Sequence, residues 1–182
     1  MTAASLTGTP RSSLDSPARP PQAHNFRDCL GRFATGVTVV TFDGVSDDGT
    51  SKRHGLTVNS FTSVSMQPPL VLVSIQRSVQ AHTLLVDRPF TVNVLGAEQR
   101  DVALHFAGKP NAEPAWVEGQ HAPRLSGTAS WFECTPWEKY NGGDHTLFLG
   151  KVEHLDYRRG DCLGFVDGNF FTIPELTTST NP

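Results

Sequence analysis

The feature that most constrains the fold is a series of short β-type segments separated by turn residues. Residues 37–42 are β-branched or aromatic almost throughout, and such residues are enriched in strands. Similar segments recur along the chain, each bounded by proline, glycine or charged residues, which mark turns. The predicted strands are 37–42, 57–65, 70–76, 90–95, 127–137, 145–157 and 163–173.

Helical patterns are fewer and shorter. Phe26, Leu30 and Phe33 recur at spacings of four and three, which predicts a helix over 25–34 with Asn25 as its cap. Apolar residues at helical spacing predict two more helices, over 78–86 and 98–106. Many short strands with few helices indicate a mainly β protein, a closed or nearly closed antiparallel barrel. No G-x-G-x-x-G follows a strand, so a Rossmann domain is not expected.

Two segments are predicted as breaks between strands. Pro68 and Pro69 cannot donate a backbone hydrogen bond in a central ladder, so the chain is expected to turn there or to cross between sheets. Residues 43–54 are polar and contain glycine, and they are predicted to form a turn.

The ends of the chain and its charge limit the expected partners. Residues 1–24 are rich in Ser, Thr, Pro and Ala, so we expect a disordered tail there, a frayed end at 177–182 and one domain over 25–176. No apolar run of about 18 residues is present, so no membrane segment is expected. The net charge of −3 comes without a basic cluster, so nucleic acid is not an expected partner.

The cysteines and histidines form no recognised metal or disulfide pattern. Cys29, Cys134 and Cys162 are odd in number and far apart, which predicts reduced thiols, buried as small apolar side chains, and a cytoplasmic location. The seven histidines show no H-x-x-x-H or H-x-E spacing, so no metal site is expected.

The segment 55–65 carries small hydroxyl and amide side chains where a plain core strand would carry valines. Neutral donors beside strand and turn backbone suit a ring system with several carbonyls and ring nitrogens. An exposed strand whose Ser and Thr side chains face water explains the same residues equally well. The residues alone leave both interpretations open.

Three motifs together resemble the flavin-reductase-like family. They are FRDCLGRFATGVTVVT at 26–41, the segment 57–70 with its NSFTSVS core, and GDHT at 143–146. The family includes the small reductase components of two-component flavin monooxygenases. The resemblance implies a homodimeric split antiparallel β-barrel of the FMN-binding type. It also implies FMN or FAD as cofactor, NADH or NADPH as co-substrate, and a partner oxygenase that receives reduced flavin.

The resemblance also implies which residues form the site. Arg77 and Ser78 have the chemistry to meet the flavin phosphate. His145 is expected beside the nicotinamide, where it positions the ring for hydride transfer to the flavin; proton donation is the weaker option. The remaining flavin contacts implied are Thr57, Asn59, Ser60, Phe61, Thr62 and Ser63.

One residue departs from the family pattern. Asn169 stands where many relatives carry arginine, and asparagine cannot supply that charge to a pyrophosphate or carboxamide. The choice between NADH and NADPH therefore stays open. Two alternatives to a flavin reductase also stay open: a flavin-binding protein without reductase activity, and a protein whose retained flavin acts on an organic substrate.

Overall fold

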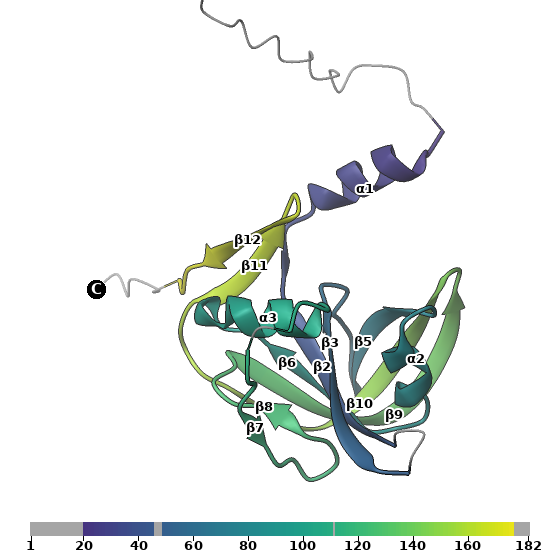
Figure 1. Ribbon diagram of the computed structural model, residues 1–182, viewed down its shortest axis with the longest axis vertical. Helices are drawn as coiled ribbons and strands as arrows, with labels where there is room; N and C mark the ends of the chain where they lie inside the picture. The colour runs from purple at the N-terminus through teal and green to yellow at the C-terminus, as the bar shows by residue number, and fades with distance from the viewer. Residues whose placement is uncertain (1–19, 46–48, 111, 177–182) are drawn as a thin grey trace, which may run out of the picture.

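The structure is a computed structural model, and it describes residues 20–45, 49–110 and 112–176. Strands dominate, with a few short helices between them (Figure 1). In chain order the elements are α1 (Ala23–Gly31), β1 (Thr35–Gly36), β2 (Thr38–Val45), β3 (Ser51–Val58), β4 (Thr62–Met66), β5 (Pro69–Gln76), α2 (Gln80–Leu85), β6 (Phe90–Val94), the 3-10 turn η1 (Ala97–Gln99), α3 (Arg100–Phe106), β7 (Trp116–Val117), β8 (Arg124–Leu125), β9 (Ser130–Gly142), β10 (His145–Tyr157), β11 (Cys162–Val166) and β12 (Asn169–Ile173).

Seven strands form one curled antiparallel sheet in the order β3-β2-β6-β9-β10-β5-β4. The sheet closes where the end of β3 approaches β5. There the Ser60 hydroxyl accepts from the Ser74 N–H (3.0 Å) and donates to the Ser74 carbonyl (2.9 Å). We call this joint between β3 and β5 the seam. The predicted mainly β, barrel-like fold is confirmed.

Strand β2 is buried on both of its faces. Val40 and Phe42 point into the barrel and pack with residues of β5 and β6. Val37, just before the strand, and Val39 pack instead with Ala103 of α3 in a second cluster. A strand covered on both faces needs residues that tolerate burial at successive positions, which accounts for the β-branched and aromatic residues at 37–42.

A smaller three-stranded sheet, β1-β11-β12, connects the barrel to α1. Figure 1 shows α1 standing away from the barrel beside the tip of the β11–β12 hairpin. The Asp167 N–H donates to the Gly31 carbonyl at 2.8 Å, and Arg32 forms an ion pair with Asp167. No residue of α1 is buried, so its apolar residues Phe26 and Leu30 remain exposed.

Several predicted boundaries are wrong. The 43–54 turn is largely strand, because β2 runs to Val45 and β3 begins at Ser51, so their polar ends pair in register. Helix α1 begins at Ala23, which places Asn25 inside it; Gln22 holds the cap position. The predicted strand 57–65 is interrupted at 59–61, and the predicted strand 163–173 is a hairpin that turns at Asp167 and Gly168, both with positive φ.

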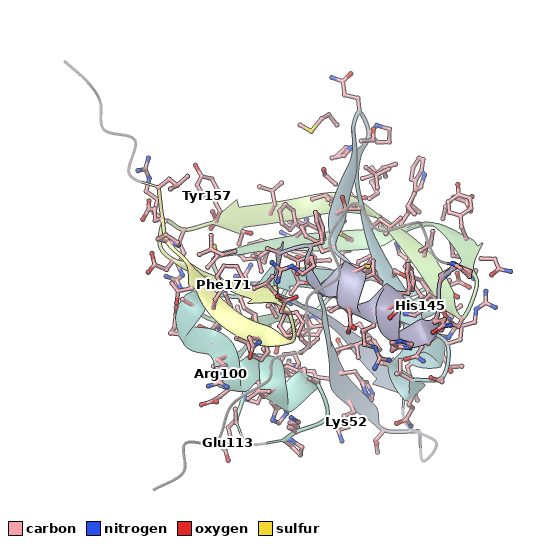
Figure 2. The ribbon with its side chains drawn as sticks, turned by 90° about the horizontal axis from the view of Figure 1, so that it is seen from above. Lys52, Arg100, Glu113, His145, Tyr157 and Phe171 are labelled. Carbon is pink, nitrogen blue, oxygen red and sulfur yellow. The ribbon has the colours of Figure 1, made fainter. Side chains whose placement is uncertain are left out.

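Pro68 and Pro69 lie at a turn, as predicted, but the chain stays in one sheet. Met66 pairs with Pro69 at the start of the β4–β5 hairpin, and this hairpin projects from the body of the barrel (Figure 2). Pro69 opens β5 beside the edge strand β4, where a residue without an N–H is tolerated. Of the predicted tail at 1–24, residues 1–19 lie outside the described residues, as does the predicted frayed end at 177–182. Ala23 and His24 already belong to α1, so this part of the tail prediction is wrong.

The three cysteines differ in exposure. Cys134 is buried as predicted, and burial raises the pKa of its thiol to about 12. Cys162 is half-buried, and burial raises the pKa of its thiol as well. Cys29 is exposed, so its predicted burial is wrong; it lies on α1, a helix with no buried residue. Within the described part of the chain, no helix has the length and apolar character to span a bilayer.

Candidate functional site

A groove of about 290 Å³ opens at the seam. The β3 side contributes Leu56, Thr57 and Asn59 and the β5 side Ser74 and Gln76, with His145 at the start of β10. Among the described strands, β3 pairs with β2 alone, so its outer edge offers backbone N–H and C=O groups to a ligand in the groove. The seam therefore combines free strand backbone with neutral polar side chains.

Three of the predicted flavin residues also hold the groove in shape. Thr57 donates its hydroxyl to the Ala103 carbonyl of α3 at 2.7 Å. Ser60 uses its hydroxyl for both hydrogen bonds to Ser74 across the seam. Phe61 packs on Phe132 with ring centroids 5.4 Å apart. These contacts fix the backbone of the β3–β4 connection beside the groove.

The other predicted flavin residues on this segment are exposed. Asn59 lines the groove and also a second, larger one of about 630 Å³ between α1 and the β11–β12 turn. Thr62 and Ser63 lie on the edge strand β4 and do not line the seam groove. Asn59 is thus the polar side chain of this segment that both grooves share.

His145 is fixed at the tip of the β9–β10 hairpin. It pairs with Gly142 on β9 and with Gln76 on β5. Figure 2 shows His145 and Tyr157 at opposite ends of β10. The His145 Nδ1 lies 2.7 Å from Asp144 Oδ1, and this hydrogen bond is the main cause that lowers the pKa of Asp144. Because an ionised carboxylate only accepts, Nδ1 donates and Nε2 is left for a ligand.

Arg77 and Ser78 do not line the seam groove. Arg77 follows β5 and turns to the opposite face of the hairpin, where its Nε donates to Thr146 Oγ1 (3.2 Å) and its Nη2 to Asn141 Oδ1 (2.8 Å). Helix α2 begins at Gln80 with Val79 at its cap position, so Ser78 precedes the cap. The structure therefore brings Asn59 and His145 together at the groove but places the Arg77 guanidinium elsewhere.

Three residues near the hairpin tip were not singled out from the sequence. Asn141 accepts from the Gly143 N–H at 3.1 Å as well as from Arg77, and Thr146 lies within hydrogen-bond distance of His82. Thr146 belongs to the GDHT motif, and the alternation of side chains along β10 puts it on the face opposite His145. His82 carried no sequence signal, because its contact with Thr146 depends on how α2 packs.

Asn169 supports the β11–β12 turn. Its Nδ2 donates to the Asp167 carbonyl at 2.8 Å. The same turn holds α1 through the Asp167 N–H, so Asn169 has a local structural role at the position where the family often has arginine.

Comparison with known proteins identifies the family. The sequence profile of the flavin reductase like domain matches residues 30–174. The chain belongs to this family. An NADH-dependent flavin reductase from a Rhodococcus species is 41% identical to this flavin reductase domain over 158 residues, covering 84% of this chain and 87% of that protein. The reductase component of a flavin-dependent trigonelline monooxygenase from Acinetobacter baylyi is 39% identical over 157 residues; the match covers 84% of this chain but only 49% of that protein.

A solved structure shares the fold of this flavin reductase domain. It is the NADH:FAD oxidoreductase of Streptomyces globisporus in complex with NAD and FAD fragments, with 34% identity and a TM-score of 0.76, covering 91% of this chain and all of that one. The donors of the seam groove fit a flavin, since amide, hydroxyl and backbone groups match its ring carbonyls and ring nitrogens.

Proposed function

We propose that this chain is an NAD(P)H-dependent flavin reductase that reduces FMN or FAD and supplies reduced flavin to a partner oxygenase. The observation that carries the proposal is the seam groove, in which neutral donors and His145 meet in a chain of the flavin reductase family. The name of the Rhodococcus relative favours NADH as the electron donor. The name of the Acinetobacter relative supports a partner monooxygenase.

When bound, the flavin supplies the acceptor for a hydride from the reduced nicotinamide. The protein's part is to align the two rings, because such a transfer depends on geometry more than on an acid or base. Asn59 and the free edge of β3 would hold the flavin. His145, with Nδ1 held by Asp144, would offer Nε2 to the nicotinamide carboxamide. His145 is therefore proposed as the residue that positions the nicotinamide.

The lining of the groove suits a flavin that exchanges with solvent. Leu56, Ser74, Gln76, Val79 and the other lining residues include no lysine, arginine, aspartate or glutamate. A flavin phosphate therefore meets no fixed charge within the groove itself. A reductase that hands its product to another protein needs such release, because slow product dissociation would limit turnover.

We also propose that the protein is a homodimer in which α1 packs on the second subunit. The helix buries no residue within its own subunit, yet it presents Phe26 (57% exposed) and Leu30 (57%), and Phe33 (76%) lies just beyond its end. Apolar side chains gathered on a rigidly held helix indicate a protein interface, and a two-fold dimer is the commonest closed assembly. The cytoplasmic location expected from the cysteines stays a prediction.

The test is anaerobic absorbance of excess free FMN or FAD with catalytic amounts of protein and either NADH or NADPH. Bleaching of many equivalents of flavin is expected, together with loss of this turnover in His145→Ala. His121→Gln, a histidine exposed outside the groove, serves as the control and should retain activity.

Two other results would replace the proposal. Flavin that binds but is not bleached by either nucleotide would establish a flavin-binding protein. Flavin that copurifies stoichiometrically, does not exchange and reacts with an added organic compound would establish the retained-flavin alternative.

A further inference from the structure

A chain of hydrogen bonds runs from α2 to the tip of the β9–β10 hairpin, on the face opposite the groove. The His82 Nε2 lies 2.9 Å from Thr146 Oγ1, and the same oxygen accepts from Arg77 Nε at 3.2 Å. Arg77 then reaches the hairpin twice more, through Nη2 to Asn141 Oδ1 and through its backbone N–H to the Asp144 carbonyl at 3.0 Å. Arg77 thus clamps the segment that carries Asp144 and His145.

The donors and acceptors in this chain favour one tautomer of His82. Arginine only donates, so Thr146 Oγ1 accepts from Arg77. The one hydroxyl proton of Thr146 is then available to His82, and the Nε2 of a neutral imidazole can accept it. We therefore assign His82 as neutral with its proton on Nδ1 when the chain of hydrogen bonds is complete.

The surroundings of His82 favour this neutral form. Its ring is half-buried and lies edge-on to Phe148, with centroids 5.5 Å apart. Burial, followed by the positive charge of Arg77, lowers the pKa of His82.

The other charged groups near the clamp have partners of their own. Lys139 of β9 bonds Asp87, which follows α2. Asp144 bonds His145 at the hairpin tip. Helix α2 itself carries no charged residue apart from His82, so Arg77 is the charge that acts on this ring.

We propose that His82 is a positioning residue for the nicotinamide site: in its neutral form it orients Thr146 so that Arg77 holds the hairpin tip that presents His145, and its protonation releases this hold. The proposal rests on the proposed hydride transfer next to His145. A protonated Nε2 would have to donate to Thr146 Oγ1, and two cations would then share one oxygen. The hairpin tip that carries His145 loses its clamp, while the Ser60–Ser74 contact between the two walls of the groove is unaffected.

The expected signature is a change in nucleotide affinity with little change in maximal turnover. On acidification from about pH 8 to about pH 5, the range in which histidine titrates, the KM for NADH should rise several-fold while kcat stays within twofold. The variant His82→Gln can still accept from Thr146 at the same place but cannot gain a proton, so most of the pH dependence of KM should disappear. Thr146→Val breaks the chain and should give a high KM at every pH.

Two controls separate this proposal from other causes. His121→Gln removes a histidine outside the clamp and should keep the wild-type pH profile. His82→Gln leaves His145 unchanged, so an effect of this variant comes from the clamp and not from a change at His145 itself. A His82→Gln enzyme with the full wild-type pH dependence of KM would overturn the positioning role.

A measurement on the protein without substrates keeps the clamp testable even if the proposed reaction fails. In nitrogen-15 NMR, His82 should show a protonated Nδ1 and an unprotonated Nε2 at neutral pH, and the Arg77 Nε–H signal should shift with the His82 titration. The opposite tautomer of His82, or an Arg77 Nε–H signal that does not shift during the His82 titration, would refute the clamp. Absence of flavin reduction with these NMR signatures intact would instead overturn the proposed function.

Discussion

The behaviour of a histidine depends on which of its two ring nitrogens carries the proton, and this protein determines that choice twice through neighbouring side chains. Asp144 accepts a hydrogen bond from Nδ1 of His145 and leaves Nε2 for a ligand. Thr146, the next residue of β10, holds the Nε2 of His82 on the other face. Asp144 and Thr146, on either side of His145, thus orient two imidazoles at one hairpin tip.

Removing the acceptor beside His145 should weaken nucleotide binding. In Asp144→Ala the imidazole loses the partner that fixes its tautomer and its rotation, so the KM for NADH should rise several-fold in steady-state assays. Asp144→Asn, which can still accept through its amide oxygen, should fall between wild type and Asp144→Ala. Asp156→Ala at the far end of β10 is the control, and an unchanged KM in Asp144→Ala would contradict the role given to Asp144.

The sequence predicted part of the candidate site because the motifs carry it. Asn59 and His145 come from the two motifs, and the fold brings both to one groove. Arg77 directly follows Gln76, which lines the groove. The alternation of side chains near the end of β5 nevertheless turns the Arg77 guanidinium to the opposite face. The second, structural role of Ser60 could not be predicted, since its partner Ser74 lies on another strand and is set by closure of the barrel.

At the scale of elements, the barrel is closed by a side chain in place of a full backbone ladder. Ser60 donates to and accepts from the same residue of β5, and this pair joins the two sides of the seam. Since the groove lies along the same line, the contact that closes the barrel also sets the distance between the two walls of the candidate flavin site.

Removal of the Ser60 hydroxyl should affect stability and flavin binding together. Ser60→Ala leaves the Ser74 N–H and C=O without this partner, which should lower the free energy of unfolding by about 1–2 kcal/mol. Urea denaturation should measure this loss, and fluorescence titration should show a higher Kd for FMN or FAD. Ser51→Ala at the exposed start of β3 is the control. Equal stability and equal flavin affinity in the two variants would refute the role of the hydroxyl in closing the barrel.

Strand identity could be predicted from the sequence better than strand length. The bounds of β10 match the prediction, because Gly143 and Asp144 on one side and the charged residues after Tyr157 on the other both mark turns. Strand β9 continues to Gly142, beyond the predicted end at residue 137, because the polar residues at its end still pair with β10. Residue propensities place the end of a strand where its apolar residues end. In the sheet, the strand continues for as long as its backbone pairs with a neighbouring strand.

At the scale of the whole molecule, α1 is held in place without being packed. The β11–β12 turn fixes its end through the Asp167 N–H and the ion pair with Arg32. The larger groove between α1 and that turn reaches Asn59 of the seam groove. A second subunit bound against α1 would therefore lie beside the candidate flavin site.

A charge on the apolar face of α1 should dissociate the proposed dimer without unfolding the subunit. Leu30 is exposed within its own chain, so Leu30→Glu costs the isolated subunit little, whereas the buried charge would be costly in the proposed interface. Sedimentation velocity should show a dimer for wild type and a monomer for Leu30→Glu, with unchanged circular dichroism. Asp28→Ala, also on α1, is the control. A wild-type protein that sediments as a monomer would refute the assembly.

The Ser60–Ser74 contact also has a consequence for how such a site can diversify. Elsewhere in the barrel, the spacing of neighbouring strands is imposed by paired backbone groups and hardly responds to single substitutions. At the seam the bridging hydrogen bonds come from one side chain, Ser60, which reaches the opposite strand. A substitution at residue 60 is therefore expected to change the width of the candidate flavin groove while the register of every strand is preserved.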